Sequence, residues 1–279
     1  MRWVIDRLRI SPPVTIEAGI RFGEVEDRPL LLDIYAPPSC ERPRPAVLLI
    51  HGGGFVGGSR SDADIVVAAR HLAEAGYVAV ALDYRLVDPG QPGPVWPAPL
   101  SDVQRAARWV RAHATTYGVD PERLGAYGIS AGAGLAAHLG VRDARDAADD
   151  DLSAFSSRAH CVVALAGPMD GTIPPANPGD IDVARALFGG MITEVPNVYR
   201  DASPVSHVDP ESAPFLVVHG VRDTVVPIAH ARRLIAALQK AGVAVEAVEV
   251  PDAGHDVFSW DRVGTRAMAF LKRYLDLDH

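Results

Sequence analysis

The sequence predicts an α/β fold built on a mostly parallel, doubly wound sheet with helices on both faces. Strand-like and helix-like segments alternate from residue 46 to the end, as they do when parallel strands are joined by right-handed crossovers. Several strand-like segments are continuous apolar runs, which is typical of strands buried on both faces. The 279 residues, 48% of them hydrophobic, suffice for one large core, so a single domain over residues 1–279 is expected.

The composition excludes several kinds of partner. The net charge is -8 at pH 7 and Lys and Arg form no cluster, which argues against nucleic acid and anionic membranes. No stretch is long and apolar enough to insert stably in a bilayer, and residues 1–6 lack a signal-peptide run, so a cytoplasmic protein is expected. Cys40 and Cys161 show no pairing or metal-binding pattern and are expected to be free thiols in a reducing compartment. Formation of a homodimer is left open.

The first half of the chain contains two short strands, a proline-rich connector and the start of the alternating pattern. Strands are expected over residues 14–22, 30–35, 46–50, 77–82 and 124–127. Helices are expected over 62–75 and 101–117, and Ser101 with Gln104 would open the second one as a capping box. Residues 89–99 hold too many prolines for regular structure.

The second half continues the alternation around one long interruption. Strands are expected over 161–166, 215–218 and 243–250, with helices over 183–188 and 227–241 and a C-terminal helix whose apolar face spans 260–274. The acidic run 146–151 is most simply a solvated loop. Residues 167–213 lack strong periodicity, and so long an interruption within a compact domain predicts a lid or substrate-binding insertion.

A candidate nucleophile lies between a strand-like and a helix-like segment. Residues 128–132 read Gly-Ile-Ser-Ala-Gly, which fits Gly-x-Ser-x-Gly with Ser130 at its centre. A serine on so sharp a turn is held in a strained backbone with its hydroxyl exposed. Gly128 and Gly132 flank the serine, and we expect that side chains at these two positions would collide across the turn. The alternative interpretation is a glycine-rich turn with a capping serine.

A serine hydroxyl needs a base, and that base needs an orienting acid. His255, in a loop between the last strand and the last helix, is the candidate base, with His207 and His219 as rivals. Asp223, which follows the strand before last, is the candidate acid, with Asp170 as the alternative. The chain order serine, acid, histidine favours His255 and Asp223.

Attack on a carbonyl also needs donors for the oxyanion. The backbone N–H groups of Gly53, Gly54 and Ala131 are the candidates, because consecutive glycines after a strand let the backbone approach a ligand closely. His51 is expected to shape this loop rather than act as the base. A phosphate-binding loop is the alternative, but no Gly-Lys-Ser/Thr follows and the spacing fails the dinucleotide pattern.

These motifs together resemble a known family. His51–Phe55, Asp83–Arg85, Gly128–Gly132, Asp223 and His255 look like the motifs of α/β-hydrolase carboxylesterases, more closely the hormone-sensitive-lipase-like and bacterial feruloyl-esterase-like esterases. The resemblance runs from about residue 30 to the end. The sequence departs from the hormone-sensitive-lipase-like branch at Ile129, where aspartate is usual, and in an N-terminal region that is short for a helical cap.

The resemblance implies an α/β-hydrolase fold and a serine carboxylesterase acting on short to medium acyl esters of small molecules. Ser130 would form an acyl-enzyme intermediate, His255 would move the proton, and Asp223 would orient the imidazole. No metal and no organic cofactor is needed. An arylformamidase-like amidase and a feruloyl or acetyl esterase are the alternatives. A non-catalytic ligand-binding homologue ranks lower, because all three triad residues are present.

Aromatic and other large side chains are expected to line an apolar substrate pocket near the serine. The candidates are Phe55, Trp96, Met169, Phe188 and Tyr199. Ordinary packing in the core or in the lid is the alternative for each of them.

Overall fold

The computed structural model describes residues 14–38, 42–90, 96–143 and 151–275. Every predicted strand is present there. The strands are β1 (Thr15–Val25), β2 (Arg28–Ala36), β3 (Arg44–Ile50), β4 (Val78–Leu82), β5 (Val119–Ile129), β6 (Cys161–Leu165), β7 (Phe215–Gly220) and β8 (Val245–Val250).

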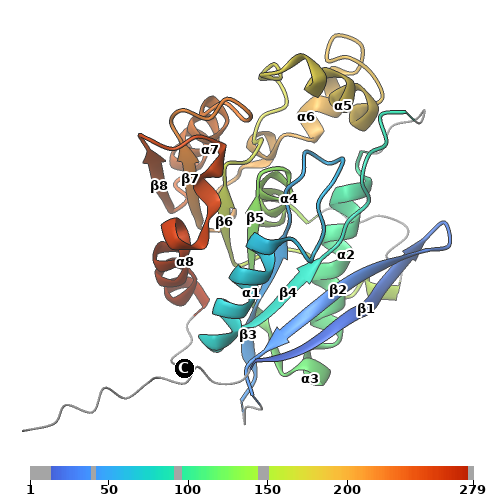
Figure 1. The fold of residues 1–279 in the computed structure, drawn as a ribbon, viewed down its shortest axis with the longest axis vertical. Helices are drawn as coiled ribbons and strands as arrows, with labels where there is room; N and C mark the ends of the chain where they lie inside the picture. Colours follow the sequence, from blue (N-terminus) through green and yellow to red (C-terminus); the bar gives the residue numbers. More distant parts are fainter. Residues whose placement is uncertain (1–13, 39–41, 91–95, 144–150, 276–279) are drawn as a thin grey trace, which may run out of the picture.

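The strands form one eight-stranded sheet in the order β1-β2-β4-β3-β5-β6-β7-β8 (Figure 1). β1 and β2 form an antiparallel hairpin at one edge, and β2 also pairs antiparallel with β4. All other neighbours are parallel, from β4 across to β8. The mostly parallel sheet confirms the predicted fold class.

Helices cover both faces of the sheet. They are α1 (Ala63–Glu74), α2 (Ala98–Ala112), α3 (Ala114–Tyr117), α4 (Ala131–Val141), α5 (Pro178–Phe188), α6 (Pro196–Asp201), α7 (Ala229–Lys240) and α8 (Trp260–Leu275), with 3-10 turns η2 (Pro204–His207) and η3 (His255–Phe258). α2, α4 and α7 share one apolar core with one face of the sheet, and α1 and α8 share a second core with the other face. The continuous apolar strands are buried between these two layers.

The start of α2 differs from the prediction. The helix begins at Ala98, and the N–H of Ser101 already bonds to the carbonyl of Pro97 at 2.9 Å. The expected capping box of Ser101 and Gln104 is therefore wrong, since both residues lie inside the helix. Proline fixes φ near the helical value and suits a first helical turn, so the prolines that exclude structure before this point open the helix here.

The 167–213 segment contains more structure than its weak periodicity predicts. It holds α5, α6 and η2, where one short helix was expected. α5 has proline in its first turn and ends at Gly189, whose φ of 79° is left-handed. Figure 1 shows α5 and α6 together at one end of the molecule, beyond β5 and β6.

Some predictions fall partly outside the described residues. Cys40 lies outside them, as does the acidic run apart from Asp151, which is exposed. Cys161 is a buried free thiol at the start of β6. Among the described residues, no helix has both the length and the apolarity that crossing a bilayer requires.

Candidate active site

Ser130 occupies a strained turn between β5 and α4. Its φ of 53° and ψ of -121° lie in a region that residues with side chains rarely adopt. The flanking glycines permit the turn, because a Cβ added at Gly128 would lie 2.2 Å from the carbonyl oxygen of Gly132. A Cβ at Gly132 would lie 2.2 Å from the carbonyl oxygen of Ile50. The predicted collision at both positions is confirmed.

The structure brings Ser130, His255 and Asp223 into one line of contacts. His255 Nε2 lies 2.9 Å from Ser130 Oγ, and His255 Nδ1 lies 2.8 Å from Asp223 Oδ2. An ionised carboxylate only accepts hydrogen bonds, so Nδ1 carries the imidazole proton and Nε2 is left to accept from the hydroxyl. The arrangement can take a proton from Ser130 and hold the resulting cation against a carboxylate.

Asp223 accepts hydrogen bonds from other groups besides His255. Its Oδ1 accepts the N–H groups of Val225 and Val226 at 2.8 and 2.9 Å, and its Oδ2 lies 3.2 Å from Nε2 of the buried His219. Burial raises the pKa of Asp223, but hydrogen bonds from His219, His255 and the two N–H groups outweigh it. The pKa therefore lies well below its usual value, and the carboxylate stays charged.

The rival residues are engaged elsewhere. The carboxylate of Asp170 bonds to Arg233 and to Thr172, each at 2.6 Å, rather than to an imidazole. His207 lies 2.8 Å from the carbonyl oxygen of Asp201 in the 167–213 segment. His219 contacts the same carboxylate oxygen as His255, because its Nε2 lies 3.2 Å from Oδ2 of Asp223, and the same nitrogen lies 2.8 Å from the carbonyl oxygen of Val226. Its role as a support for the acid was not predicted, although its position four residues before Asp223 on β7 was visible.

The glycine loop after β3 runs directly past the serine. A Cβ added at Gly52 would lie 3.2 Å from Ser130 Cβ. Gly53 and Gly54 have left-handed φ values of 105° and 61°, and both line the same cavity as Ser130. The N–H of Ala131 lies in the first turn of α4, where the helix offers it no carbonyl. All three predicted oxyanion donors are thus at the cavity.

His51 is buried beneath this loop and contacts its backbone. It is 1% exposed, its Nδ1 lies 2.7 Å from the carbonyl oxygen of Gly52, and burial lowers its pKa. The ring stacks on Tyr84 at a centroid distance of 4.3 Å, and the Tyr84 hydroxyl donates to the carbonyl of His51 at 3.0 Å. Arg85, the last residue of the Asp-Tyr-Arg motif, pairs with the buried Asp102 at 2.7 Å. Tyr84 therefore supports the loop, Arg85 ties the motif to α2, and neither residue is among those that line the cavity beside Ser130.

A cavity of about 520 Å³ opens beside Ser130. Of the five predicted pocket residues, Phe55, Phe188 and Tyr199 line it, whereas Met169 and Trp96 do not. Met169 is 1% exposed and packs in the core, so its placement in the pocket is wrong. The prediction for Trp96 is also wrong, because a polar partner holds its indole N–H away from the cavity.

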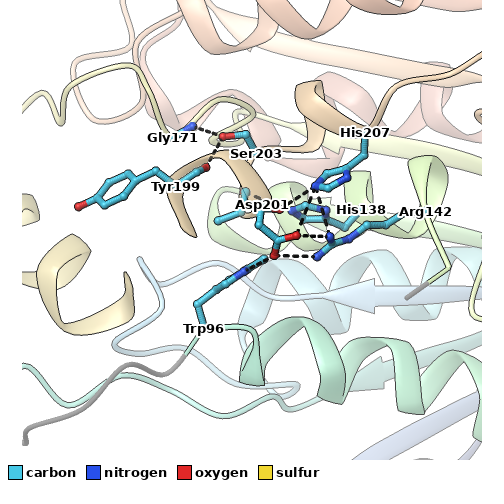
Figure 2. A network of polar contacts seen from close by, with 9 residues as sticks. Trp96, His138, Arg142, Gly171, Tyr199, Asp201, Ser203 and His207 are labelled. Atoms are coloured by element: carbon cyan, nitrogen blue, oxygen red, sulfur yellow. Dashed lines mark hydrogen bonds and ion pairs between the residues drawn. The ribbon is translucent and has the colours of Figure 1, made fainter. Parts of the chain in front are cut away.

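That partner is Asp201, at the end of α6 (Figure 2). Its carboxylate accepts from Trp96 Nε1 at 2.8 Å and from Arg142 at 2.7 Å, which ties the 167–213 segment to the end of α4. Ser203 closes the segment on itself, because its hydroxyl donates to the carbonyl of Tyr199 and accepts the N–H of Gly171 (Figure 2). Trp96 reaches the cavity only indirectly, through an edge contact with Phe188.

Other cavity residues were not predicted. Apolar ones come mainly from the 167–213 segment, including Ile173, Val183, Ala184 and Leu187. Charged or polar ones are Asp62, Asp64, Asp180 and His230. The amphipathic pattern of residues 178–188 was the available signal for the first group. Nothing local in the sequence marks the second group, because only the folded chain gathers them.

The BD-FAE family model matches residues 32–238, about three quarters of the chain. The chain belongs to the BD-FAE family. Among curated relatives, Esterase LipC of Mycobacterium tuberculosis is 32% identical over 252 residues, which is 88% of this chain and 61% of that protein. Esterase LipQ of the same organism is 32% identical over 81% of this chain and 53% of its own length. The chain thus spans little more than half of these two relatives.

Solved structures extend the likeness over nearly the whole BD-FAE chain. A thermophilic esterase, Est2, from the Planctomycetes species Thermogutta terrifontis has a TM-score of 0.77 and 27% identity, covering 96% of this chain and 94% of that one. The same esterase is known with butyrate bound and phosphonylated by sarin, and these structures also give TM-scores of 0.77. The likeness confirms the α/β-hydrolase fold.

Proposed function

We propose that this BD-FAE chain is a serine carboxylesterase that hydrolyses short to medium acyl esters through an acyl-enzyme intermediate. The observation that carries the proposal is the continuous path from Ser130 Oγ through the imidazole of His255 to Asp223, with contacts of 2.9 and 2.8 Å. The esterase relatives and the likeness to Est2 support the same reaction class.

In the first half of the reaction, Ser130 Oγ bonds to the ester carbonyl carbon while its proton passes to His255 Nε2. The electron pair of the carbonyl moves to its oxygen, which the N–H groups of Gly53, Gly54 and Ala131 receive. Each such donor contributes about 3 kcal/mol to the transition state. The tetrahedral intermediate then collapses, the ester C–O bond breaks, and His255 gives its proton to the leaving alcohol.

In the second half, water replaces the alcohol. His255 takes a proton from the water, the hydroxide attacks the acyl carbon, and collapse breaks the bond to Ser130 Oγ. The acid leaves and the serine recovers its proton. Throughout, Asp223 keeps Nδ1 protonated and the ring in place, which its lowered pKa permits.

The cavity supports a small substrate. A volume of about 520 Å³ accommodates an acyl chain of a few carbons together with a compact alcohol. The butyrate found in Est2 supports the same range of acyl length. We further propose that the enzyme works in a reducing, cytoplasmic compartment, where free thiols such as that of Cys161 are usual.

Replacement of Ser130 by alanine tests the proposal. The variant should fold normally and lose turnover of p-nitrophenyl butyrate to the level of the uncatalysed reaction. A fluorophosphonate should label the wild-type protein once per chain and leave the variant unlabelled. Substantial turnover by the alanine variant would sink the assignment. A panel that sets esters against N-formyl aromatic amines separates the esterase from an arylformamidase.

A further inference from the structure

His230 is a buried histidine that the proposed reaction does not use. It lies in the first turn of α7, is 6% exposed, and contributes to the lining of the cavity beside Ser130. Its Nδ1 accepts the backbone N–H groups of Met169 and Asp170, each at 3.2 Å. A ring nitrogen that accepts two hydrogen bonds carries no proton, so the neutral ring holds its proton on Nε2.

The Nε2–H group of His230 has no hydrogen-bond partner in the part of the chain that the structure describes. Among the described residues, no side chain or carbonyl accepts from it, while Nδ1 is fully engaged. Nδ1 faces the backbone of Met169 and Asp170 while the residue contributes to the lining of the cavity, so Nε2 is the ring nitrogen left for a ligand there. A donor placed there loses a hydrogen bond unless water or a ligand supplies an acceptor. The side chains of the neighbouring cavity residues Val226 and Pro227 are apolar and offer this donor no acceptor.

The charge of this ring decides which acceptors suit it. Burial and, to a smaller extent, the nearby His219 together lower the pKa of His230 to about 4. The ring is therefore neutral at ordinary pH and offers a hydrogen bond without a positive charge. Asp62, Asp64 and Asp180 line the same cavity and repel anions. Together these residues favour an uncharged oxygen over a carboxylate.

We propose that His230 is a specificity-determining residue whose Nε2–H binds a second, uncharged oxygen of the substrate, such as an ether, keto or hydroxyl oxygen. The scissile carbonyl is met by the amides of Gly53, Gly54 and Ala131, so this donor is free for another group. The inference rests on the proposed esterase function and narrows its substrate class. The second oxygen belongs either to the acyl part or to the alcohol part of the ester.

Matched ester pairs test the proposal, because replacing CH₂ by oxygen hardly changes shape. On the acyl side the pairs are p-nitrophenyl butyrate with methoxyacetate, and pentanoate with 3-methoxypropanoate. On the alcohol side the pair is butyl acetate with 2-methoxyethyl acetate. For each pair we take the ratio of kcat/KM, divided by the same ratio for alkaline hydrolysis. Wild type should favour the oxygen member roughly tenfold in at least one pair, as expected for one hydrogen bond.

Substitutions then assign the preference to the imidazole. His230→Phe and His230→Met lack the donor and should lose the tenfold preference. His230→Gln keeps an amide donor, and an acceptor for the N–H groups of Met169 and Asp170, so it should retain the preference. Ile173→Val alters the cavity wall without touching a polar group and should leave the ratio unchanged. The methionine variant serves if the phenylalanine variant does not fold.

The outcomes separate the two proposals. If the wild type hydrolyses the esters without the second oxygen but shows no preference for the oxygen member of any pair, the role of His230 is overturned. The proposed esterase function then still stands. The role of His230 is also overturned if the phenylalanine or methionine variant prefers the oxygen member as strongly as the wild type does. If the wild type hydrolyses none of these esters, or if Ser130→Ala hydrolyses them as fast as the wild type, the proposed function is overturned and this inference with it.

Discussion

Replacing Asp223 by asparagine changes a single atom of the site and should nearly abolish activity. The Oδ1 position accepts two backbone N–H groups at 2.8 and 2.9 Å, so the amide oxygen must remain there. The amide NH₂ then faces His255 Nδ1, which donates to Oδ2 in the wild type at 2.8 Å. To avoid two facing donors, His255 moves its proton to Nε2 and can no longer accept from Ser130.

The size of the loss follows from this tautomer change. In a serine protease with the same triad, the equivalent exchange lowers kcat by about 10⁴-fold, because the wrong nitrogen carries the proton. That factor corresponds to about 5.4 kcal/mol of transition-state stabilisation. The NH₂ also faces His219 Nε2, which lies 3.2 Å from Oδ2. This second conflict should reduce the free energy of unfolding by about 1–3 kcal/mol.

The measurements are kcat/KM on p-nitrophenyl butyrate and thermal unfolding. Asp223→Asn should fall about 10⁴-fold while remaining folded at the assay temperature. The double variant with His255→Ala should be no worse than the poorer single variant, because the triad acts as a unit. A loss of less than tenfold in the folded asparagine variant would refute the tautomer argument.

Three further predictions concern stability. Gly132→Ala should lower the free energy of unfolding by about 3 kcal/mol or more, since its Cβ would lie 2.2 Å from a backbone oxygen. Gly179→Ala, where nothing lies within 4 Å, is the control and should raise it by about 0.5–1 kcal/mol; equal effects in denaturant melts would contradict the clash. Asp201→Ala removes the partner of Trp96 and Arg142, so it should cost about 1–3 kcal/mol and speed proteolytic cleavage within residues 167–213, whereas unchanged cleavage would show that the contact does not hold the segment. The pKa of His230 lies near 4, below its unfolded value of about 6.5, so the unfolded chain binds the proton first and stability falls as pH drops between these values. Melts at about pH 7 and pH 4.5 should show His230→Gln losing about 2–3 kcal/mol less than wild type, and equal losses would rule out that contribution.

The sequence predicted the strands and most helices because their signals are local. Continuous apolar runs such as 46–50 depend only on burial on both faces of a parallel sheet. The order of the Ser130, Asp223 and His255 motifs predicted their gathering, since parallel strands bring their carboxyl ends to one edge. Local rules failed where two signals competed, as at Ser101, where prolines upstream had already opened the helix.

The pocket could be predicted only in part. Phe55, Phe188 and Tyr199 were identified as aromatic residues near the site, and aromatic character alone suggested Trp96 equally well. The partner that holds Trp96 away from the cavity is Asp201, 105 residues further along the chain. His230 was missed for the same kind of reason, because its tautomer depends on backbone groups 60 and 61 residues earlier. Such long-range polar pairs leave no periodic trace in a sequence.

The aspartates in the cavity wall also bear on how a turnover ends. The ester enters without charge, but the acid formed from it ionises as soon as it is free. It then carries the same sign as Asp62 and Asp64 at the start of α1 and Asp180 on α5, and as the protein as a whole. Electrostatic repulsion pushes the acid out of the pocket, so the cleaved acid should inhibit the enzyme only weakly even when it accumulates.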